Sequence, residues 1–449
     1  MRSVLPTVAA RASEGQRVAA APDRRTTIGA VDSWLEPARE LPVIGRPDVL
    51  VVGAGSAGIA AALAAARRGA DTWLLERSGF LGGLATVGLI NLLLTMDDGG
   101  GTVVVAGLCQ EFVDRVEGRG AARYPPSPEW DNEDPDAVDR WRRWGLIWGA
   151  PPEAVRYSVA FDPEVFIDVA HEALADAGVR LRLHSWFASV GMSGGVVGAV
   201  IVESKRGREA ICPRMVVDAT GDGDVLVSAG AEHEQVAIPP YLWFRVGGVE
   251  DAGGAPGGGR EWFLTTGKGR VLVPWGPSPD RVDPCDPDDM TQAEVRCRLA
   301  AHGAFERLRR EVPAFADAWL DDYARMLGIT ESRRLVGAYV LRKEDGDVRF
   351  GDSVAQTGHW TRRHVVFDVP YRCLVSPAVA NLLVAGRCIS TTRYVHQATK
   401  EIPAAMATGE AAGAAAARAV ATDVAVQDVD VGALRADLRS RGAFVGGVD

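Results

Sequence analysis

The sequence has few lysines, no paired cysteines and no long basic run. Four of its 49 basic residues are lysine, which leaves 45 arginines, and we interpret this bias as codon usage in a GC-rich genome. The net charge of -10 argues against nucleic acid or an anionic membrane as the main partner. The cysteines form no CxxC motif, so we expect no metal site, no dithiol centre and a cytoplasmic location with reduced thiols. They are Cys109, Cys212, Cys285, Cys297, Cys373 and Cys388.

Long apolar segments are also missing. Near the first glycine-rich loop, the longest apolar run without a charge is "SAGIAAALAAA", which is too short to cross a bilayer. Residues 1 to about 30 are rich in Arg and Ala and lack the compact apolar segment of a secretory signal. We therefore expect residues 1–32 to form a disordered tail and expect no membrane partner.

A glycine loop stands between two predicted strands in "DVLVVGAGSAGIAAALAAARRGADTWLLE". The apolar run 49–52, the Ala-rich helix and "DTWLLE" together predict a strand–helix–strand unit. Gly53, Gly55 and Gly58 form GxGxxG, in which the backbone turns tightly and approaches a pyrophosphate at the helix N-terminus. Glu76 lies 23 residues after Gly53, where a carboxylate accepts hydrogen bonds from a ribose hydroxyl. This unit predicts a dinucleotide site.

Later glycines favour FAD over NAD as that dinucleotide. Gly82 and Gly83 follow the second strand closely, "VVDATGDGD" ends a strand at Gly221, and "LLVAGR" ends another at Gly386. Strand ends that carry glycines expose their backbone, and together they would form a long binding surface for an extended ligand. We call this surface the FAD track. FAD needs such a track, whereas NAD sites seldom use strands from the far end of a chain.

The remaining pattern predicts an α/β protein, with a Rossmann-like FAD-binding domain and an inserted mixed α+β substrate domain. "GLCQEFVDRVEGRG" and "DPEVFIDVAHEALADAG" read as amphipathic helices, the second capped by Asp162. "VRLRLHSWFASV" reads as one strand, and a hairpin and a further strand follow it. Alternation of strand and helix stops after this region and returns at "NLLVAGRCIS", residues Asn381 to Ser390. The expected segments are 33–235 and 366–425 for the FAD-binding domain, 236–365 for the substrate domain and 426–449 for a C-terminal tail.

Five motifs in this order resemble the FAD-dependent oxidoreductase family of bacteria. They are "VDSWLEPARELPV", the glycine-loop unit through "GFLGGLAT", "DATGDGDV", "ESRRLVGAYVL", and "VPYRCLVSPAVANLLVAGRCIS" with "GEAAGAAAA". The resemblance covers about residues 33 to 420 and extends more distantly to glutathione-reductase-like and fumarate-reductase-like flavoproteins of the GR2 type. It implies FAD as cofactor, held by Gly53, Gly55, Ser56, Ala57, Gly58, Glu76, Arg77, Gly82, Gly83, Thr86, Phe187, Ala219, Thr220, Gly221, Asp222, Gly386, Arg387, Pro403, Ala404 and Ala405.

The segment "TTRYVHQATKEIP" is the candidate loop for catalysis, because it joins a strand of the FAD track to the next helix. We expect His396 to be the acid–base residue, since an imidazole accepts a proton near neutral pH. Arg393 lies on the same loop, and Tyr371 and His364 are reserves just ahead of the same strand. The helix expected to begin at Pro403 would stabilise negative charge on reduced flavin through its dipole.

Three functional classes stay open. The leading one is an oxidoreductase that transfers a hydride from an alcohol or amine carbon of a small molecule to flavin N5. The second is an NAD(P)H-using flavin hydroxylase, and the third is a non-redox FAD-binding protein. Without a second GxGxxG a separate nicotinamide domain is disfavoured, and without paired cysteines a disulfide reductase is disfavoured. The electron acceptor, either O2 or a nicotinamide cofactor, and a homo-oligomeric state stay open too.

Overall fold

The computed structural model describes residues 36–149, 151–254, 257–274, 280–346 and 348–448. The predicted disordered tail, residues 1–32, lies outside the described residues. Residues 36–40 are exposed and form no helix or strand. The residues from Leu41 onward form one compact unit.

A parallel sheet of five strands forms the centre of this unit. Its order is β20-β11-β2-β3-β7, and each strand pairs in parallel with its neighbours. The strands are β2 (Val49–Val52), β3 (Thr72–Leu75), β7 (Arg180–Arg182), β11 (Met215–Asp218) and β20 (Leu382–Val384). All four residues of β2, β3 and β11 are buried, as expected for strands that are covered on both faces. This sheet confirms the predicted α/β class and the predicted strand–helix–strand unit.

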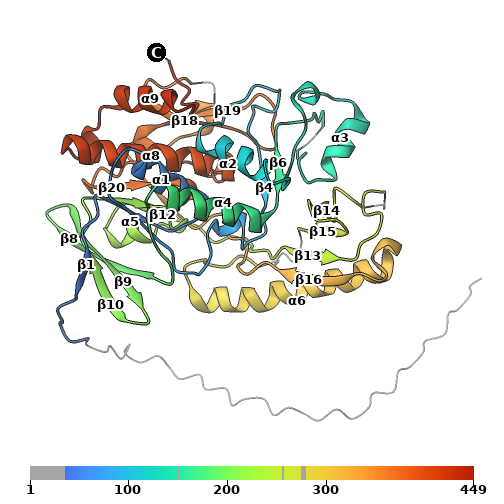
Figure 1. Cartoon of the computed structure of the whole chain (residues 1–449), viewed down its shortest axis with the longest axis horizontal. Coiled ribbons are helices and arrows are strands. Elements are labelled where there is room, and N and C mark those ends of the chain that lie inside the picture. Colours follow the sequence, from blue (N-terminus) through green and yellow to red (C-terminus); the bar gives the residue numbers. More distant parts are fainter. Residues whose placement is uncertain (1–35, 150, 255–256, 275–279, 347, 449) are drawn as a thin grey trace, which may run out of the picture. The chain divides into compact units, whose positions relative to one another are not determined.

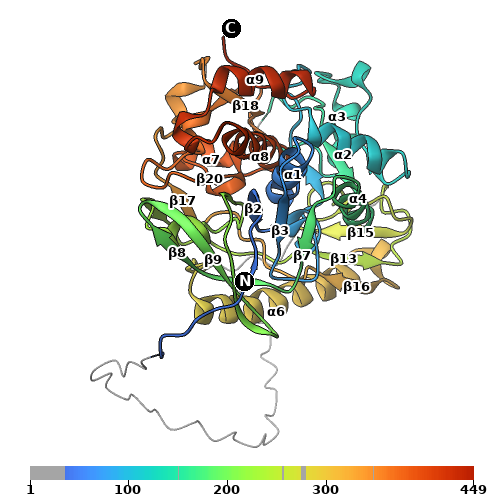
Figure 2. The same ribbon diagram turned by 60° about the vertical axis from the view of Figure 1, so that its left-hand side comes forward.

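The two faces of the central sheet meet different layers. Val49 and Val51 of β2 share a core with the helices α1 (Ser56–Ala66), α4 (Pro163–Asp176) and α8 (Ile402–Thr422). Leu50 and Val52 instead share a core with the hairpin strands. Because side chains alternate along a strand, one four-residue segment supports both layers. Figure 2 shows α1, α4 and α8 on one side of β2 and β3, and the hairpin strands β8 (Trp186–Ser193) and β9 (Val196–Ser204) on the other.

The hairpin layer is the sheet β1-β10-β9-β8, formed by β1 (Val43–Gly45), β8 (Trp186–Ser193), β9 (Val196–Ser204) and β10 (Gly207–Ile211). The predicted single strand "VRLRLHSWFASV" is wrong, because it is divided between β7 of the central sheet and β8 of this layer. His184 lies between the two with a φ of 54°, so the chain turns there and changes sheets. The predicted hairpin is confirmed by the antiparallel pairing of β9 with β10.

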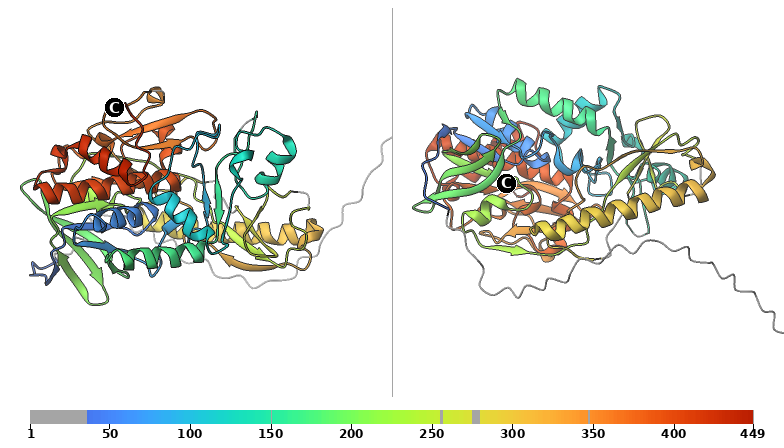
Figure 3. Two further views of the ribbon diagram at one scale, coloured as in Figure 1. Left: turned by 45° about the horizontal axis from the view of Figure 1, so that its top comes forward. Right: turned by 90° about the horizontal axis from the view of Figure 1, so that it is seen from below.

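Helices α1 and α8 pack unusually closely. A Cβ atom on Gly409 would lie 2.1 Å from the carbonyl oxygen of Ala57, and one on Gly413 would lie 2.0 Å from that of Ala61. Only glycine therefore fits at these two positions of α8. Figure 1 and Figure 3 both show α1 and α8 side by side. This contact fixes the beginning of α8 relative to the glycine loop that precedes α1.

A second core lies beside the antiparallel sheet β14-β15-β13-β16 and the long helix α6 (Pro287–Glu311). The strands are β13 (Phe244–Gly247), β14 (Phe263–Leu264), β15 (Arg270–Val273) and β16 (Trp319–Tyr323). Figure 1 shows α6 running beneath β13 and β16. The helix begins after Asp286, whose side chain accepts from the amides of Asp288 and Asp289. The assignment of residues 236–365 to a separate domain stays a prediction.

The other elements connect or cover these parts. Helices α2 (Leu108–Glu117) and α4 confirm the two predicted amphipathic helices, and Asp162 caps α4 as expected. The segment predicted as a C-terminal tail contains a helix with buried Leu434 and Leu438. The remaining bounds are α3 (Pro135–Arg142), α5 (Asp224–Ser228), α7 (Arg393–Thr399), α9 (Val431–Ser440), β4 (Leu92–Leu93), β5 (Ala122–Arg123), β6 (Val159–Phe161), β12 (His233–Gln235), β17 (Arg333–Leu335), β18 (Ser353–Gly358) and β19 (Val366–Pro370).

Candidate functional site

The carboxyl ends of four neighbouring strands form one edge of the central sheet. In sheet order these ends are followed by Glu76 after β3, Gly53 after β2, Ala219 after β11 and Gly386 after β20. Strands in a sheet lie about 4.8 Å apart, so three steps span about 14 Å. All four residues line one cavity of about 630 Å³. The arrangement suits a long ligand that lies across the strand ends.

The glycine loop exposes backbone to this cavity. Gly53 has a φ of 98°, and a Cβ on it would lie 2.5 Å from the carbonyl oxygen of Ala219. A Cβ on Gly58 would lie 1.7 Å from the carbonyl oxygen of Gly53, so helix and strand approach as the motif predicts. At Gly55 no protein atom would lie within 4 Å of an added Cβ. The free first-turn amides of α1 and the open space at Gly55 form a cradle for a diphosphate.

Glu76 is held in place at one end of the cavity. Its Oε2 accepts from the amide of Ala54 at 3.0 Å, and its Oε1 accepts from the amide of Ser78 at 2.8 Å. Each oxygen keeps a lone pair that can accept from a ribose hydroxyl. The neighbouring Arg77 lies over the ring of Trp186 at 5.2 Å, and both line the cavity. This end suits an adenosine.

An ion pair joins the ends of β11 and β20. Arg387 donates from Nη2 to Oδ1 of Asp222 at 2.6 Å, and the Ser332 hydroxyl donates to the same oxygen at 2.6 Å. Burial acts to raise the pKa of Asp222, but Arg387 and Ser332 outweigh it and hold the pKa below its usual value. Asp222 therefore stays charged, and the pair fixes two glycine turns, at Gly221 and Gly386, with φ of 81° and 73°.

Helix α8 begins at the far end of the same cavity. Ile402 and Ala405 of its first turn line the wall, together with Lys400 and Glu401 just before it. Lys400 donates from Nζ to Oε1 of Glu401 at 2.5 Å, and only 12% and 11% of these two side chains are exposed. The Glu401 side chain makes no capping hydrogen bond to the helix. This ion pair is thus available to a ligand in the cavity.

Four aromatic side chains line the cavity beside this ion pair, and we call this part the aromatic chamber: Trp148, Tyr241, Trp243 and Trp360. Lys400 Nζ lies 5.4 Å from the centre of the Trp360 ring. Trp360 in turn packs edge-on against Trp148 at 5.6 Å, and Tyr241 packs against Trp243 at 6.0 Å. The chamber therefore adjoins the α8 end of the cavity and suits the apolar or aromatic part of a small molecule.

The cavity wall includes all but five of the residues predicted to bind the cofactor. Those five are Gly58, Thr86, Phe187, Pro403 and Ala404, and each has a local reason. Gly58 packs against the loop, Thr86 is buried beneath Gly82, and Phe187 packs toward the hairpin core while its neighbour Trp186 faces the cavity. Helix α8 begins at Ile402, one residue before the predicted Pro403, and its residues Ile402 and Ala405 line the wall in place of Pro403 and Ala404. Binding by the predicted residues stays a prediction.

None of the three predicted catalytic residues lies on the cavity wall. His396 is fully buried, and its Nε2 lies 2.9 Å from the carbonyl oxygen of Thr330. Burial lowers the pKa of His396 to about 3, so the ring stays neutral. The hydroxyl of Tyr371 donates to the carbonyl oxygen of Val426, and Arg393 lies 3.6 Å from the carboxylate of Glu331. These positions do not support the roles that we predicted for them.

The reason lies in the local secondary structure. The predicted loop "TTRYVHQATKEIP" is wrong over its middle part, which forms the short helix α7 with His396 on its buried face. The reserve residue His364 is exposed and lies 3.6 Å from the carboxylate of Asp98. His359 is buried, and burial lowers its pKa to about 4.

Sequence reasoning missed most of the aromatic chamber. Its members come from distant segments, so no spacing joins them, although one of them, Trp148, belongs to the tryptophan-rich run "RWRRWGLIWG". Lys400 and Glu401 were within the candidate catalytic segment, but their location immediately before a helix drew no assignment. Trp148 is the one member of the chamber for which a sequence signal existed.

Two kinds of comparison bear on this site. The family model described as "FAD dependent oxidoreductase" matches residues 48–284 and 255–438. No curated protein matches the chain. Among solved structures, p-nitrophenol 4-monooxygenase from Pseudomonas putida DLL-E4 is similar with a TM-score of 0.50 and 13% identity, over 85% of this chain and 82% of that one. At that identity the similarity shows the fold.

Two more solved structures are similar at lower scores. A geranylgeranyl bacteriochlorophyll reductase-like protein from Thermoplasma acidophilum has a TM-score of 0.47 and 14% identity, over 88% of this chain and 84% of that one. L-Amino acid deaminase from Proteus myxofaciens has a TM-score of 0.45 and 14% identity, over 87% and 93%.

The cofactor is FAD, and the cavity fits it. The cradle at Gly55, the oriented carboxylate of Glu76 and the strand-end track provide what an extended dinucleotide needs. In the described part of the chain, no group of three or more His, Cys, Asp or Glu side chains is placed to hold a metal ion. Over the same residues, no helix combines the length and apolar character needed to span a membrane.

Proposed function

This chain belongs to the FAD dependent oxidoreductase family, and from that premise we propose that it oxidises a small molecule at a carbon bearing a hydroxyl or amino group. The observation that supports this proposal is the aromatic chamber, which adjoins the α8 end of the FAD cavity and the Lys400–Glu401 pair. A substrate whose apolar part fills the chamber would present its polar carbon to that pair. The proposed substrate class is therefore an alcohol or amine with an apolar or aromatic group.

The cofactor would use the cavity along its whole length. Glu76 would hold the adenosine ribose, the loop from Gly53 to Ala57 the diphosphate, and Gly386, Arg387 and Ala405 the flavin end. When bound, FAD supplies a two-electron acceptor for a hydride. The chain must then remove a proton from the substrate oxygen or nitrogen, because hydride loss otherwise leaves a protonated carbonyl or imine.

We propose Glu401, in place of His396, as the group that takes this proton. Its Oε1 is bound by Lys400, and Glu401 lines the cavity, so Oε2 would be the acceptor. With FAD bound, the hydride of the C–H bond would go to the cofactor, and the O–H or N–H proton would move to the carboxylate of Glu401. The Lys400 ammonium balances the charge of Glu401 before the transfer.

Residues 236–365 would contribute the substrate side of the site. Tyr241, Trp243 and Trp360 of this segment line the chamber, and Tyr241 and Trp243 directly precede β13. This placement supports the predicted substrate domain as a proposal. Strands β17 and β18 of the same segment pair with β12 and β19 instead, so the boundary at 365 stays a prediction.

Anaerobic reduction of the purified holoprotein tests the function. We expect a small aromatic alcohol or amine to bleach the flavin absorbance, and Glu401→Gln to slow that bleaching on the order of a hundredfold, the usual effect of a general base. FAD content should not change, because Glu401 makes no capping bond to α8. Glu311→Gln is the matched control, since Glu311 also accepts from an adjacent basic residue but lies at an exposed helix end. Equal rates for Glu401→Gln and the wild type would remove Glu401 from the proposal.

A second candidate is an NAD(P)H-using hydroxylase. The cation of Lys400 beside the flat wall of Trp360 suits an acidic phenol, whose phenolate the ammonium would stabilise. In that case NADPH, and no alcohol or amine, would bleach the flavin, and a phenol would accelerate the bleaching. The same anaerobic experiment separates the two functions.

A further inference from the structure

Arg325 and Phe80 meet on the wall of the FAD cavity. The guanidinium carbon of Arg325 lies 4.7 Å from the centre of the Phe80 ring, and both side chains are exposed at the cavity. Arg325 comes from the segment between β16 and β17, whereas Phe80 follows β3 and Glu76. The backbone of Arg325 is fixed by a hydrogen bond of 2.7 Å from its amide to the carbonyl oxygen of Val87. The pair thus joins the substrate side of the cavity to the FAD track.

The segment of Phe80 passes over the glycine loop. Two residues later, the amide of Gly82 donates to the carbonyl oxygen of Ala54 at 2.8 Å, and Gly82 forms a bridge with Gly55. Gly55 is the loop position at which a Cβ would meet no protein atom. Phe80 and the guanidinium of Arg325 therefore line the same cavity as the loop position that is shaped for a diphosphate.

The charge of Arg325 has no carboxylate partner among the described residues. Two other arginines at this end of the sheet are paired, Arg387 with Asp222 and Arg333 with Asp224, whereas Arg77 lies over the ring of Trp186. A guanidinium that is held against an aromatic ring and faces a cavity is suited to bind phosphate oxygens in a forked geometry.

We propose that Arg325 binds the diphosphate of FAD and, stacked on Phe80, closes the cavity over it. The negative charge of two phosphates would supply the partner that Arg325 lacks. This inference needs only FAD as the cofactor, so it holds or fails independently of the proposed reaction. Its ligand chemistry is that of an adenosine diphosphate.

Equilibrium binding to the apoprotein tests this proposal. We expect Arg325→Ala to raise the Kd for FAD about tenfold or more, as for loss of a charge-assisted hydrogen bond. The Kd of Arg325→Lys should lie between the values of the wild type and Arg325→Ala. ADP should lose affinity by a similar factor, whereas adenosine, which lacks phosphates, should bind as in the wild type. The wild-type Kd should rise with salt more steeply than that of Arg325→Ala.

Arg309→Ala is the matched control. Arg309 also stacks on a phenylalanine, Phe305 at 5.7 Å, but it lies on α6 away from the cavity wall. This variant should bind FAD, ADP and adenosine like the wild type. An FAD Kd for Arg325→Ala within twofold of the wild-type value would overturn the proposal. Equal losses of adenosine and ADP affinity would overturn it too, because the contact would then not be to phosphate.

Discussion

The carbonyl oxygen that His396 contacts belongs to Thr330, and Thr330 itself lies on the cavity wall. His396 therefore lies one residue layer away from the cavity, and its hydrogen bond positions Thr330 of the cavity wall. Its ring is neutral because burial lowers the pKa to about 3, far below the range in which an imidazole exchanges protons at neutral pH. Sequence reasoning selected His396 by residue type and by its place before α8. No pattern in the sequence indicates that a short helix forms here and directs the ring of His396 into the core.

We predict that His396→Leu lowers the free energy of unfolding by about 2 kcal/mol at pH 7, because Thr330 loses its partner and the packing changes. The rate of anaerobic flavin reduction should stay near that of the wild type. In acid, the unfolded chain binds a proton at His396 more strongly than the folded chain does. The folded chain therefore loses stability as the pH falls. The wild type should therefore lose up to about 1.4 kcal/mol per pH unit below about pH 6.5 through this group.

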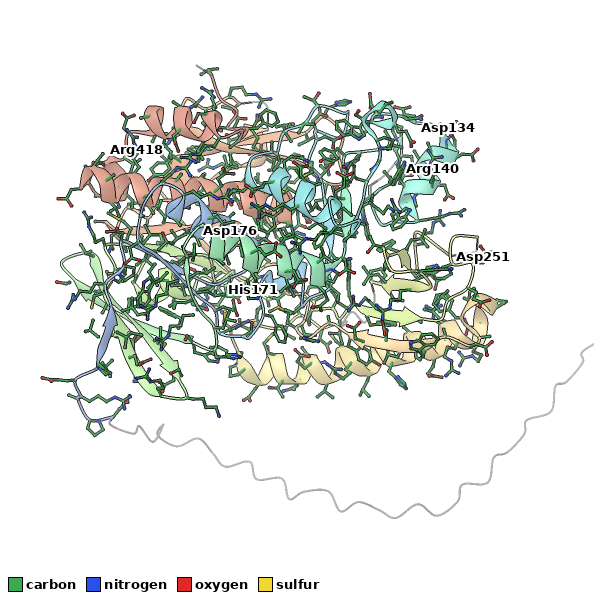
Figure 4. The ribbon with its side chains drawn as sticks, viewed as in Figure 1. Asp134, Arg140, His171, Asp176, Asp251 and Arg418 are labelled. Carbon is green, nitrogen blue, oxygen red and sulfur yellow. The ribbon has the colours of Figure 1, made fainter. Side chains whose placement is uncertain are left out.

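Urea unfolding between pH 4.5 and 8 measures this effect as the difference between wild type and variant. His171→Leu is the control, because His171 is an exposed histidine of α4, as Figure 4 shows. It should leave the pH dependence unchanged. A large loss of flavin reduction in His396→Leu with unchanged FAD content would restore the catalytic assignment.

Glu410 on α8 provides a second prediction. Only 4% of it is exposed, and its Oε2 accepts from the amide of Leu108 at the beginning of α2 at 2.9 Å. Burial raises the pKa of Glu410 to about 7. The folded chain thus binds the Glu410 proton more strongly than the unfolded chain, so the contribution of Glu410 to stability is greatest below about pH 4.5 and falls as the pH rises to about 7. The loss amounts to about 3 kcal/mol.

Glu410→Gln should remove this loss. The free energy of unfolding of the variant, relative to the wild type, should rise by up to about 3 kcal/mol from pH 4.5 to 8. Glu306→Gln, at a half-exposed position on α6, should show no such change. A constant difference between Glu410→Gln and the wild type over this pH range would mean that Glu410 has an ordinary pKa in the folded chain.

Elements with a strong local signal were predictable, and those fixed by long-range contacts were not. The unit β2–α1–β3 followed from its apolar runs and glycines, and α4 from its Asp-Pro beginning. Helix α7 was missed because its seven residues carry polar and β-branched side chains and too little length for a periodic pattern. The division between β7 and β8 depends on which sheet each part joins, which no local pattern states.

The glycine loop between β2 and α1 provides a testable prediction about these elements. Gly55→Val should abolish FAD retention, because the new side chain enters the space that a diphosphate needs. The fold should survive, since no protein atom would lie within 4 Å of the added Cβ. The flavin content of the purified variant, with circular dichroism as a check of folding, measures both.

Gly303→Val is the matched control for this substitution. Gly303 is an exposed position of α6 at which an added Cβ also meets no atom within 4 Å. This variant should purify with the flavin content of the wild type. Full flavin content in Gly55→Val would instead contradict the assignment of the cradle.

At the scale of the molecule, the FAD half of the site was predictable and the substrate half was not. The track follows the strand order of a parallel sheet, and each strand end carries its own glycine signal in the sequence. The aromatic chamber instead combines Trp148, Tyr241, Trp243 and Trp360, which become neighbours only when the second core packs beside the first. Their side chains are also common in ordinary cores, so residue type alone assigned them no role.

The central claim is that one cavity holds FAD with its flavin ring between the beginning of α8 and the aromatic chamber. A crystal structure of the holoprotein tests it most directly. We predict the adenosine at Glu76, the diphosphate at the loop from Gly53 to Ala57, and the isoalloxazine facing Trp360 and the Lys400–Glu401 pair. An isoalloxazine at the Glu76 end, or a flavin outside this cavity, would contradict the account.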